Sequence, residues 1–190
     1  TILSRTYFAR NTEDFYRFYR DKMLCLDAKP NAAHLKLAEL ERAGKLKAVV
    51  TQNIDGLHQL AGSQTVYELH GSVHRNYCTQ CRTFYGVDFI AEGEGVPCCS
   101  VCGGVVKPDV VLYEEGLDQD TVEGAVMAIA KADVLIVGGT SLVVYPAAGL
   151  INYYRGHKLV LINRDPTPYD SQADLVLHDS LGKVLGGIVL

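Results

Sequence analysis

The sequence lacks the features that direct a protein to nucleic acid or to a membrane. No two Lys or Arg residues are adjacent, and 22 acidic residues outnumber 18 basic ones, which makes the formal net charge −4. Binding to a phosphate backbone needs a basic patch, so we expect no direct contact with nucleic acid. No apolar run is long enough to span a bilayer, so we expect no membrane partner either.

A secretory leader and low-complexity segments are also missing. Residues 1–10 do not show a basic segment followed by an apolar core, which favours a cytoplasmic protein. The chain opens on Thr1 and not on Met, so we expect further sequence ahead of it. Hydrophobic residues make up 48% and charged residues 21% of the chain, which is typical of folded globular proteins. A chain of 190 residues predicts one main core with a small insert.

Helix-like and strand-like segments alternate along most of the chain. Helices are expected to begin near Asn11 and Asn31 and to cover residues 118–131 and 146–154. Strands are expected at residues 47–51, 66–69, 110–113, 134–137, 159–162 and 175–177. Several of these strands are apolar at consecutive positions, which is typical of parallel strands that are covered on both faces. The pattern predicts an α/β fold, an open parallel sheet with helices on both faces.

Four cysteines form the most specific motif. Cys78 and Cys81 make one C-x2-C pair, and Cys99 and Cys102 make a second pair after seventeen intervening residues. This spacing is typical of a tetrahedral zinc site. Because four thiolate ligands leave no position for a catalytic water, the zinc would be structural. The alternative is a set of four free buried cysteines.

Two cysteines remain outside these pairs. Cys98 could replace Cys99 as the partner of Cys102, but the matching spacers and the glycine turn after the pair favour Cys99. Cys98 and Cys25 are then expected to serve as small hydrophobic residues. Segment 73–106, with its cysteine pairs, aromatic residues and glycines, is predicted to be a small inserted module.

Polar loops follow three of the predicted strands, where open α/β sheets bind ligands. Residues 52–58 (QNIDGLH) form a dense polar cluster. Residues 138–142 (GGTSL) form a glycine turn whose backbone N–H groups could cradle phosphate, and residues 163–165 (NRD) could contact ribose hydroxyls. Each loop alone is also typical of an ordinary turn. His70 follows the strand at 66–69, and its position is equally compatible with a structural role and with general-base catalysis.

Together these motifs resemble the sirtuin family in order and spacing. The matching segments are TQNIDGLH at 51–58, ELHGS at 68–72, the two cysteine pairs, KPDVVLYEE at 107–115, GGTSL at 138–142 and IN at 162–163. The resemblance covers essentially the whole chain and looks closest to bacterial members. One departure is Glu114, where many members have glycine. The family's first strand and glycine-rich loop have no counterpart here, so we expect them ahead of Thr1 or absent.

The resemblance implies two domains and two cofactors. A Rossmann-like NAD-binding domain would comprise residues 1–72 and 107–190, and a zinc-binding module would comprise residues 73–106. NAD would be the co-substrate and zinc a structural ion bound by the four paired cysteines. The residues implied to bind NAD are Gln52, Asn53, Ile54, Asp55, His70, Gly139, Thr140, Ser141, Asn163, Arg164 and Asp179. Those implied in catalysis are His70 as the base, Asn53 and Asp55, and those beside the substrate peptide are Val111, Tyr113 and Val144.

The implied activity is that of an enzyme. It is the NAD-dependent removal of acyl groups, acetyl foremost, from protein lysine, which yields nicotinamide, O-acyl-ADP-ribose and free lysine. The partners would be acyl-lysine proteins or peptides. Two alternatives stay open, transfer of ADP-ribose to protein on the same scaffold and a non-catalytic zinc-ribbon interaction module. Convergence of His70 and Asp55 would argue against the second alternative.

Overall fold

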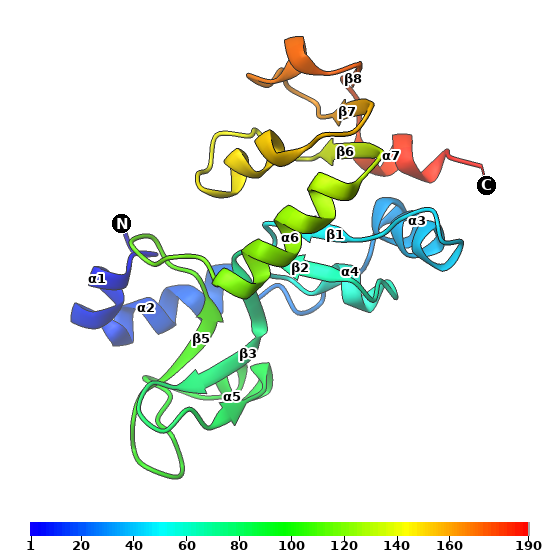
Figure 1. The fold of residues 1–190 in the computed structure, drawn as a ribbon. Coiled ribbons are helices and arrows are strands. Elements are labelled where there is room, and N and C mark those ends of the chain that lie inside the picture. Colours follow the sequence, from blue (N-terminus) through cyan, green and yellow to red (C-terminus); the bar gives the residue numbers. More distant parts are fainter. Residues whose placement is uncertain (190) are drawn as a thin grey trace. The chain divides into compact units, whose positions relative to one another are not determined.

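The computed structural model describes residues 1–189, which pack into two compact units (Figure 1). Unit 1 comprises Thr1–Ala28, Gln52–Gly56 and His70–Leu117. Unit 2 comprises Lys29–Thr51, Leu57–Leu69 and, of the described residues, 118–189. No helix in the described part of the chain is both long enough and apolar enough to cross a membrane.

Unit 1 is built around an antiparallel sheet of three strands in the order β4-β3-β5 (Figure 1). Its elements are α1 (Arg5–Arg10), α2 (Thr12–Phe18), the π-helix η1 (Tyr19–Met23), β3 (Gly71–Cys78), β4 (Phe84–Tyr85), α5 (Val87–Ala91) and β5 (Val106–Val110). The aromatic side chains of Phe15, Tyr16 and Tyr19 are buried in one cluster with Val73 and Val106 of the sheet. The cysteine segment therefore shares a hydrophobic core with the N-terminal helices.

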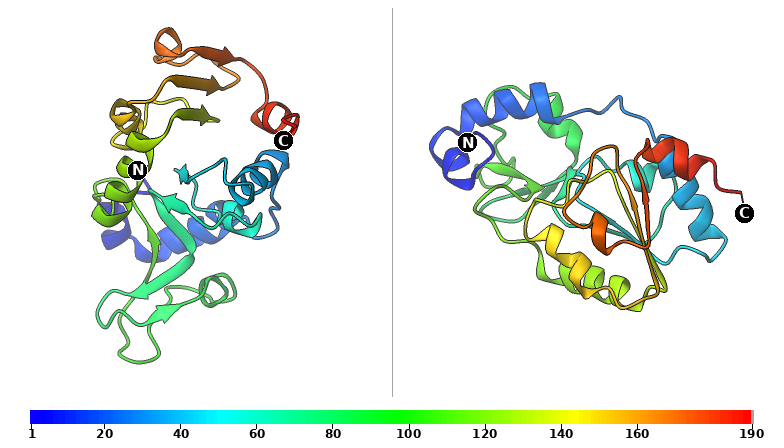
Figure 2. Two further views of the ribbon diagram at one scale, coloured as in Figure 1. Left: turned by 45° about the vertical axis from the view of Figure 1, so that its right-hand side comes forward. Right: turned by 90° about the horizontal axis from the view of Figure 1, so that it is seen from above.

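Unit 2 holds the parallel strands. Its elements are α3 (Ala32–Arg42), β1 (Val49–Thr51), α4 (Leu57–Leu60), β2 (Val66–Glu68), α6 (Gln119–Lys131), β6 (Val134–Gly138), the 3₁₀-helix η2 (Ala147–Tyr153), β7 (Lys158–Ile162), the 3₁₀-helix η3 (Asp170–Gln172), β8 (Leu175–Leu177) and α7 (Leu181–Gly186). Figure 2 shows β6, β7 and β8 side by side in one parallel sheet. Leu159 and Leu161 of β7 pack in one hydrophobic cluster, and Val160 and Ile162 pack in another. Both faces of β7 are thus covered, as its consecutive apolar residues predict.

The α/β class with parallel strands is confirmed, and the parallel strands of the described residues fall into two groups. Within residues 1–189, β1 and β2 make one parallel sheet, while β6, β7 and β8 make another. β6 is an edge strand of its sheet, and the side chains of Val134 and Ile136 are 51% and 38% exposed.

One predicted strand is wrong. The sequence predicts a strand at residues 110–113, whereas β5 ends at Val110 and runs antiparallel to β3, with Val110 opposite Gly71 and Val106 opposite Cys78. Beyond β5, Tyr113 forms an isolated bridge with Ser4. The position of this strand is decided by its partner β3, and not by the local apolar run.

The remaining elements are confirmed with small shifts. The strand predicted at 175–177 has the same bounds in the structure, and the helix predicted at 118–131 begins one residue later. The segment predicted as a helix at 146–154 is the 3₁₀-helix η2. The helix predicted from Asn11 ends as an α-helix at Phe18 and continues as the π-helix η1.

The compact units group the chain differently from the predicted domains. Residues 1–28 fall in the predicted NAD-binding domain, yet they pack with the cysteine segment in unit 1. Residues 52–56 and 70–72 are also predicted to belong to the NAD-binding domain, and they too pack in unit 1. The predicted domains concern cofactor binding and not packing, so they stay a prediction.

Candidate functional site

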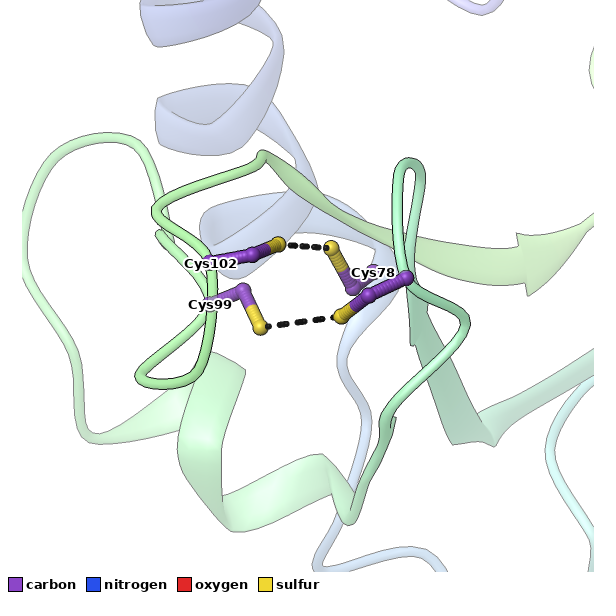
Figure 3. A group of neighbouring side chains, drawn as sticks. Cys78, Cys99 and Cys102 are labelled. Atoms are coloured by element: carbon purple, nitrogen blue, oxygen red, sulfur yellow. Dashed lines mark hydrogen bonds between the residues drawn. The ribbon is translucent and has the colours of Figure 1, made fainter.

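Four cysteine thiols come together in unit 1. The Sγ atoms of Cys78, Cys81, Cys99 and Cys102 all lie within 4.8 Å of one another. The Sγ–Sγ distance is 3.4 Å from Cys78 to Cys102 and 3.5 Å from Cys81 to Cys99, and Figure 3 shows the thiols facing one another from two loops. A tetrahedral site with Zn–S bonds of about 2.3 Å has S–S edges of about 3.8 Å. The four thiols therefore fit a structural zinc ion.

The two cysteine pairs adopt the same backbone turn. The N–H of Arg82 donates to the carbonyl oxygen of Cys78 at 3.1 Å, and the N–H of Gly103 donates to that of Cys99 at 2.9 Å. Arg82 and Gly103 both take positive φ angles, of 63° and 76°. In each pair the N–H two residues after the first cysteine lies 3.4 Å from its sulfur. Two matched turns of this kind present their thiolates to one metal.

A tyrosine hydroxyl supports the second pair. The hydroxyl of Tyr85 donates to the Sγ atom of Cys99 at 3.1 Å. This hydrogen bond is the largest of several that together lower the pKa of the Cys99 thiol to about 6, the others coming from Cys81 and from backbone N–H groups of the same loop. The thiolate is the form that binds metal, so Tyr85 favours the ligand state of Cys99.

Cys99, and not Cys98, belongs to the thiol cluster. Cys98 is exposed, and its thiol contacts a backbone carbonyl of its own loop at 3.5 Å. Cys25 is exposed as well, so the prediction that both residues serve as small hydrophobic residues is wrong. The alternative of four free buried cysteines is wrong too, because Cys81 and Cys102 are exposed and the four thiols converge.

His70 lies between β2 and β3 and faces the polar loop after β1. Its Nδ1 atom is 3.0 Å from the carbonyl oxygen of Gln52. Because a carbonyl oxygen can only accept, Nδ1 carries the proton of the neutral ring and Nε2 carries the lone pair. The loop therefore holds His70 in the tautomer in which Nε2 can accept a proton.

The polar loop also runs along the start of β3. The N–H of Val73 donates to the carbonyl oxygen of Ile54 at 3.0 Å. Within the loop, the side-chain amide of Asn53 donates to the carboxylate of Asp55 at 3.4 Å. The loop that carries the predicted nicotinamide-side residues is thus hydrogen-bonded to the segment that begins with His70, and all of them belong to unit 1.

Gly71, next to His70, allows β3 to approach β5 closely. Its φ is +76°, and a Cβ atom would lie 1.8 Å from the carbonyl oxygen of Asp109. Gly71→Ala is expected to lower the free energy of unfolding by more than about 2 kcal/mol, because it adds a backbone clash to left-handed strain. Chemical denaturation measures the loss.

Gly95→Ala is the matched control for Gly71→Ala. Gly95 also belongs to unit 1 and has a φ of +60°, but its Cβ position has no atom within 4 Å. The control variant carries the conformational cost without the clash. Equal losses of stability in the two variants would show that the close approach of Gly71 to Asp109 does not contribute to the free energy of unfolding.

The predicted peptide residues Val111 and Tyr113 follow β5. The N–H of Val111 donates to the carbonyl oxygen of His70 at 3.0 Å. The backbone of Tyr113 is paired with the N-terminal segment, since its N–H donates to Leu3 and its carbonyl oxygen accepts from Arg5, both at 3.0 Å. The Tyr113 side chain is exposed. These two residues therefore connect the His70 segment to the N-terminal helices.

Glu114, which departs from the family pattern, ties the same segment to α1. Its carboxylate accepts hydrogen bonds from the hydroxyl of Thr6 at 2.6 Å and from the N–H of Thr6 at 2.9 Å. These contacts lower the pKa of the Glu114 carboxyl. Glu114 takes a φ of +76°, which glycine adopts more readily. Its side chain makes a contact that glycine could not make.

The glycine turn predicted to meet phosphate lies after β6 in unit 2. Gly139 has a φ of +64°, and its N–H donates to the end of β7 at 3.1 Å. The Oγ1 atom of Thr140 accepts a backbone N–H two residues further on at 3.2 Å. Ser141 and Val144 are exposed. The helix expected after this turn begins at Ala147 and is the 3₁₀-helix η2.

The predicted adenosine residues follow β7 and β8. Asn163 and Arg164 come directly after β7, and the side-chain amide of Asn163 donates to the carbonyl oxygen of Asp165 at 2.8 Å. Asp179 follows β8, and its carboxylate accepts from Lys183 at 2.6 Å. That contact lowers the pKa of Asp179.

Two residues of the site give no signal in the sequence. Tyr85 contacts a cysteine fourteen residues away, and His74 contacts the carbonyl oxygen of Asp55, nineteen residues away, through Nε2 at 3.0 Å. Neither lies in a recognisable motif. Such contacts depend on how distant segments meet, so local patterns do not encode them.

The fold and the site together define a class of protein. It is an α/β protein with a four-cysteine cluster that fits a metal ion and with a histidine beside a polar loop. The model of the Sir2 family matches residues 1–146, and the chain belongs to this family, the sirtuins. The family that the motifs predict is therefore confirmed.

Individual relatives agree with this assignment. The chain is 62% identical over 189 residues to an NAD-dependent protein deacetylase of Clostridium acetobutylicum, a match that covers 99% of this chain and 77% of the relative. A solved structure of Sir2 bound to acetylated peptide superposes with a TM-score of 0.92 at 42% identity, over 97% of this chain and 80% of that one. A structure of Sir2 with a p53 peptide and NAD+ gives a TM-score of 0.91 at 42% identity, with the same coverage.

Proposed function

We propose that this chain is an NAD-dependent protein-lysine deacylase that removes acetyl groups foremost. The observation that carries the proposal is the His70 tautomer, because the Gln52 carbonyl on Nδ1 leaves Nε2 as a base beside the polar loop. Membership of the Sir2 family and similarity to an NAD-dependent protein deacetylase support the proposal. The neighbouring Sir2 structures with NAD+ and with acetylated peptide support the two substrates.

The proposed contacts with NAD follow the sirtuin resemblance. Gln52 and Asn53 contact the nicotinamide ribose, while Ile54 and Asp55 line the pocket of the nicotinamide ring and its carboxamide. The proposed contacts with phosphate, ribose and adenosine come from Gly139, Thr140, Ser141, Asn163, Arg164 and Asp179. Hydrogen bonds from His70 and from Val73 of β3 to the 52–56 loop supply the rigidity that such positioning needs.

The first chemical step depends on positioning. The amide oxygen of the acyl-lysine attacks C1′ of the ribose as the bond to nicotinamide breaks, so Asp55 is proposed to fix the carboxamide of the leaving group. Nε2 of His70 then takes a proton through the ribose hydroxyls, and the 2′-hydroxyl oxygen attacks the imidate carbon. Addition of water releases free lysine and O-acyl-ADP-ribose.

Zinc has a structural place in this proposal. Cys78, Cys81, Cys99 and Cys102 would hold it, and it would join the two matched turns of unit 1. Four protein ligands leave no open position on the metal, so the reaction does not pass through it.

The proposed partner is an acyl-lysine protein or peptide that adds as a strand beside Val111, Tyr113 and Val144. The backbone N–H and carbonyl of Tyr113 are already paired with the N-terminal segment. Hydrogen bonds to the peptide backbone are therefore expected from neighbouring residues, and Tyr113 is expected to contribute its exposed side chain. A cytoplasmic location and the lack of a nucleic-acid partner stay predictions.

The test is an assay of the full-length protein with NAD and a panel of lysine peptides that differ in acyl chain. We expect nicotinamide release that depends on the acylated peptide, with O-acyl-ADP-ribose and free lysine formed in equal amounts. The unacylated peptide is the control. Nicotinamide release together with ADP-ribose bound to protein, and without O-acyl-ADP-ribose, would overturn the proposal in favour of ADP-ribosyl transfer.

Asp55→Asn tests the proposed role of Asp55 in the first step. The variant is expected to lose nicotinamide release and nicotinamide exchange together by about a hundredfold, the cost on the order of a 1 Å misplacement of a reacting group. Incorporation of labelled nicotinamide into NAD, with acyl peptide present, measures exchange. Near-normal exchange in Asp55→Asn would remove Asp55 from the leaving-group site.

A further inference from the structure

Residues of the segment 70–74 hold three carbonyl groups of the 52–56 loop. His70 Nδ1 contacts the carbonyl oxygen of Gln52, and the N–H of Val73 donates to that of Ile54, each at 3.0 Å. The third contact comes from a side chain, since Nε2 of His74 lies 3.0 Å from the carbonyl oxygen of Asp55. The proposed chemistry uses His70 and Asp55, but it gives His74 no part.

The geometry fixes which His74 nitrogen carries a proton. The carbonyl oxygen of Asp55 can only accept, so Nε2 of His74 is the donor. Nε2 carries a hydrogen in this tautomer of the neutral ring and also in the charged ring. The contact with Asp55 is therefore kept in both protonation states.

The His74 ring also packs against the next residue of the loop. A Cβ atom on Gly56 would lie 2.7 Å from Cδ2 and 2.9 Å from Nε2 of His74, so the ring rests directly on the Gly56 backbone. The backbone of His74 is anchored in turn, because its N–H donates at 3.2 Å to the hydroxyl of Ser72, which is buried. Although the His74 side chain is exposed, it is held at the loop by a hydrogen bond and by packing.

We propose that His74 is a positioning residue, whose imidazole fixes the backbone of Asp55 and Gly56 so that the Asp55 side chain meets the nicotinamide leaving group in the productive orientation. This inference rests on the proposed deacylase function. His74 touches neither substrate in the proposal and acts through the loop. A shift of the loop by about 1 Å is enough to cost on the order of a hundredfold in rate, so even partial release has a measurable effect.

Two variants separate the hydrogen bond from packing. His74→Phe keeps a ring over Gly56 but removes the donor to the Asp55 carbonyl. His74→Gln places an N–H donor at a reach similar to that of Nε2 and cannot titrate. We expect nicotinamide exchange to fall by about tenfold in His74→Phe, in line with the loss of one hydrogen bond, and to stay within about twofold of the native rate in His74→Gln.

The measurements are nicotinamide exchange, KM for NAD, KM for acyl peptide and Tm, all on the full-length protein. The proposal expects the loss in His74→Phe to fall on exchange and on the NAD parameters, with the peptide KM and Tm nearly unchanged. Native exchange in His74→Phe would overturn it, and so would equal losses in the Phe and Gln variants. Failure of the native protein to release nicotinamide would instead overturn the proposed function.

Discussion

Cys81→Ser is expected to lose bound zinc and to unfold the cysteine segment of unit 1. The zinc content should fall from about one ion per chain to near zero, because three thiolates cannot supply the binding free energy on the order of 10 kcal/mol that folds such sites. Cys78 and Cys99 lie in the same hydrophobic core as Phe15 and Val106, so the loss should spread to the N-terminal helices. Metal analysis and limited proteolysis of residues 73–106 measure the two effects.

The matched control is Cys98→Ser, which changes the cysteine next to a predicted ligand. Cys98 is exposed and lies outside the thiol cluster, so this variant should keep its zinc and its resistance to proteolysis. Full zinc occupancy in Cys81→Ser would contradict the four-cysteine site. Loss of zinc in Cys98→Ser alone would assign the fourth ligand to Cys98.

His70→Ala is expected to stop deacylation while nicotinamide exchange continues. The variant lacks the proton acceptor for the ribose hydroxyls, and loss of a general base costs about a hundredfold to ten-thousandfold in turnover. The earlier bond to nicotinamide breaks without this base in the proposed mechanism, so labelled nicotinamide should still enter NAD. Parallel assays of free lysine and of exchange measure the two steps. Equal losses of both would show that the two steps are not divided between His70 and Asp55.

The pH dependence of the native enzyme tests the same residue. Since Nε2 must be unprotonated to act, kcat/KM should fall on the acid side of the pH profile. His74→Gln controls for the second histidine of this segment, because glutamine does not titrate. If kcat/KM of His74→Gln still falls at low pH as in the native enzyme, the fall is due to His70. If the fall disappears in this variant, it is due to His74.

The elements that the sequence predicts well are those with a strong local cause. The strand at 175–177 is a short apolar run between polar residues, and α6 begins beside the N-cap Asp118, whose carboxylate accepts from the N–H of Thr121 at 2.9 Å. The zinc motif is equally local, because each C-x2-C pair forms its own turn. The prediction fails where an element is set by a strand that lies far away in the sequence. The bounds of β5 are an example, because they follow from its pairing with β3.

In the candidate site, too, the sequence predicts what depends on local motifs and misses contacts between distant segments. The sirtuin resemblance predicts that residues 52–55 and His70 act together. All of them lie in unit 1, and their joint action stays a prediction. No motif predicts the contacts of His74 with Asp55 or of Tyr85 with Cys99. Each joins residues from different segments, so it forms only when the chain has folded.

The sequence by itself determined the family, the four metal-binding cysteines as a set and the alternation of helices and strands, since these depend on residue type and spacing along the chain. The tertiary structure confirmed that Cys99, which the matching spacers favour over Cys98, joins the thiol cluster. It alone decided that β5 ends at Val110 and pairs with β3. It alone decided the tautomer of His70 as well. The physical reason is that a proton position or a strand register is set by the hydrogen-bond partner, and the carbonyl oxygen of Gln52 lies eighteen residues away in the chain.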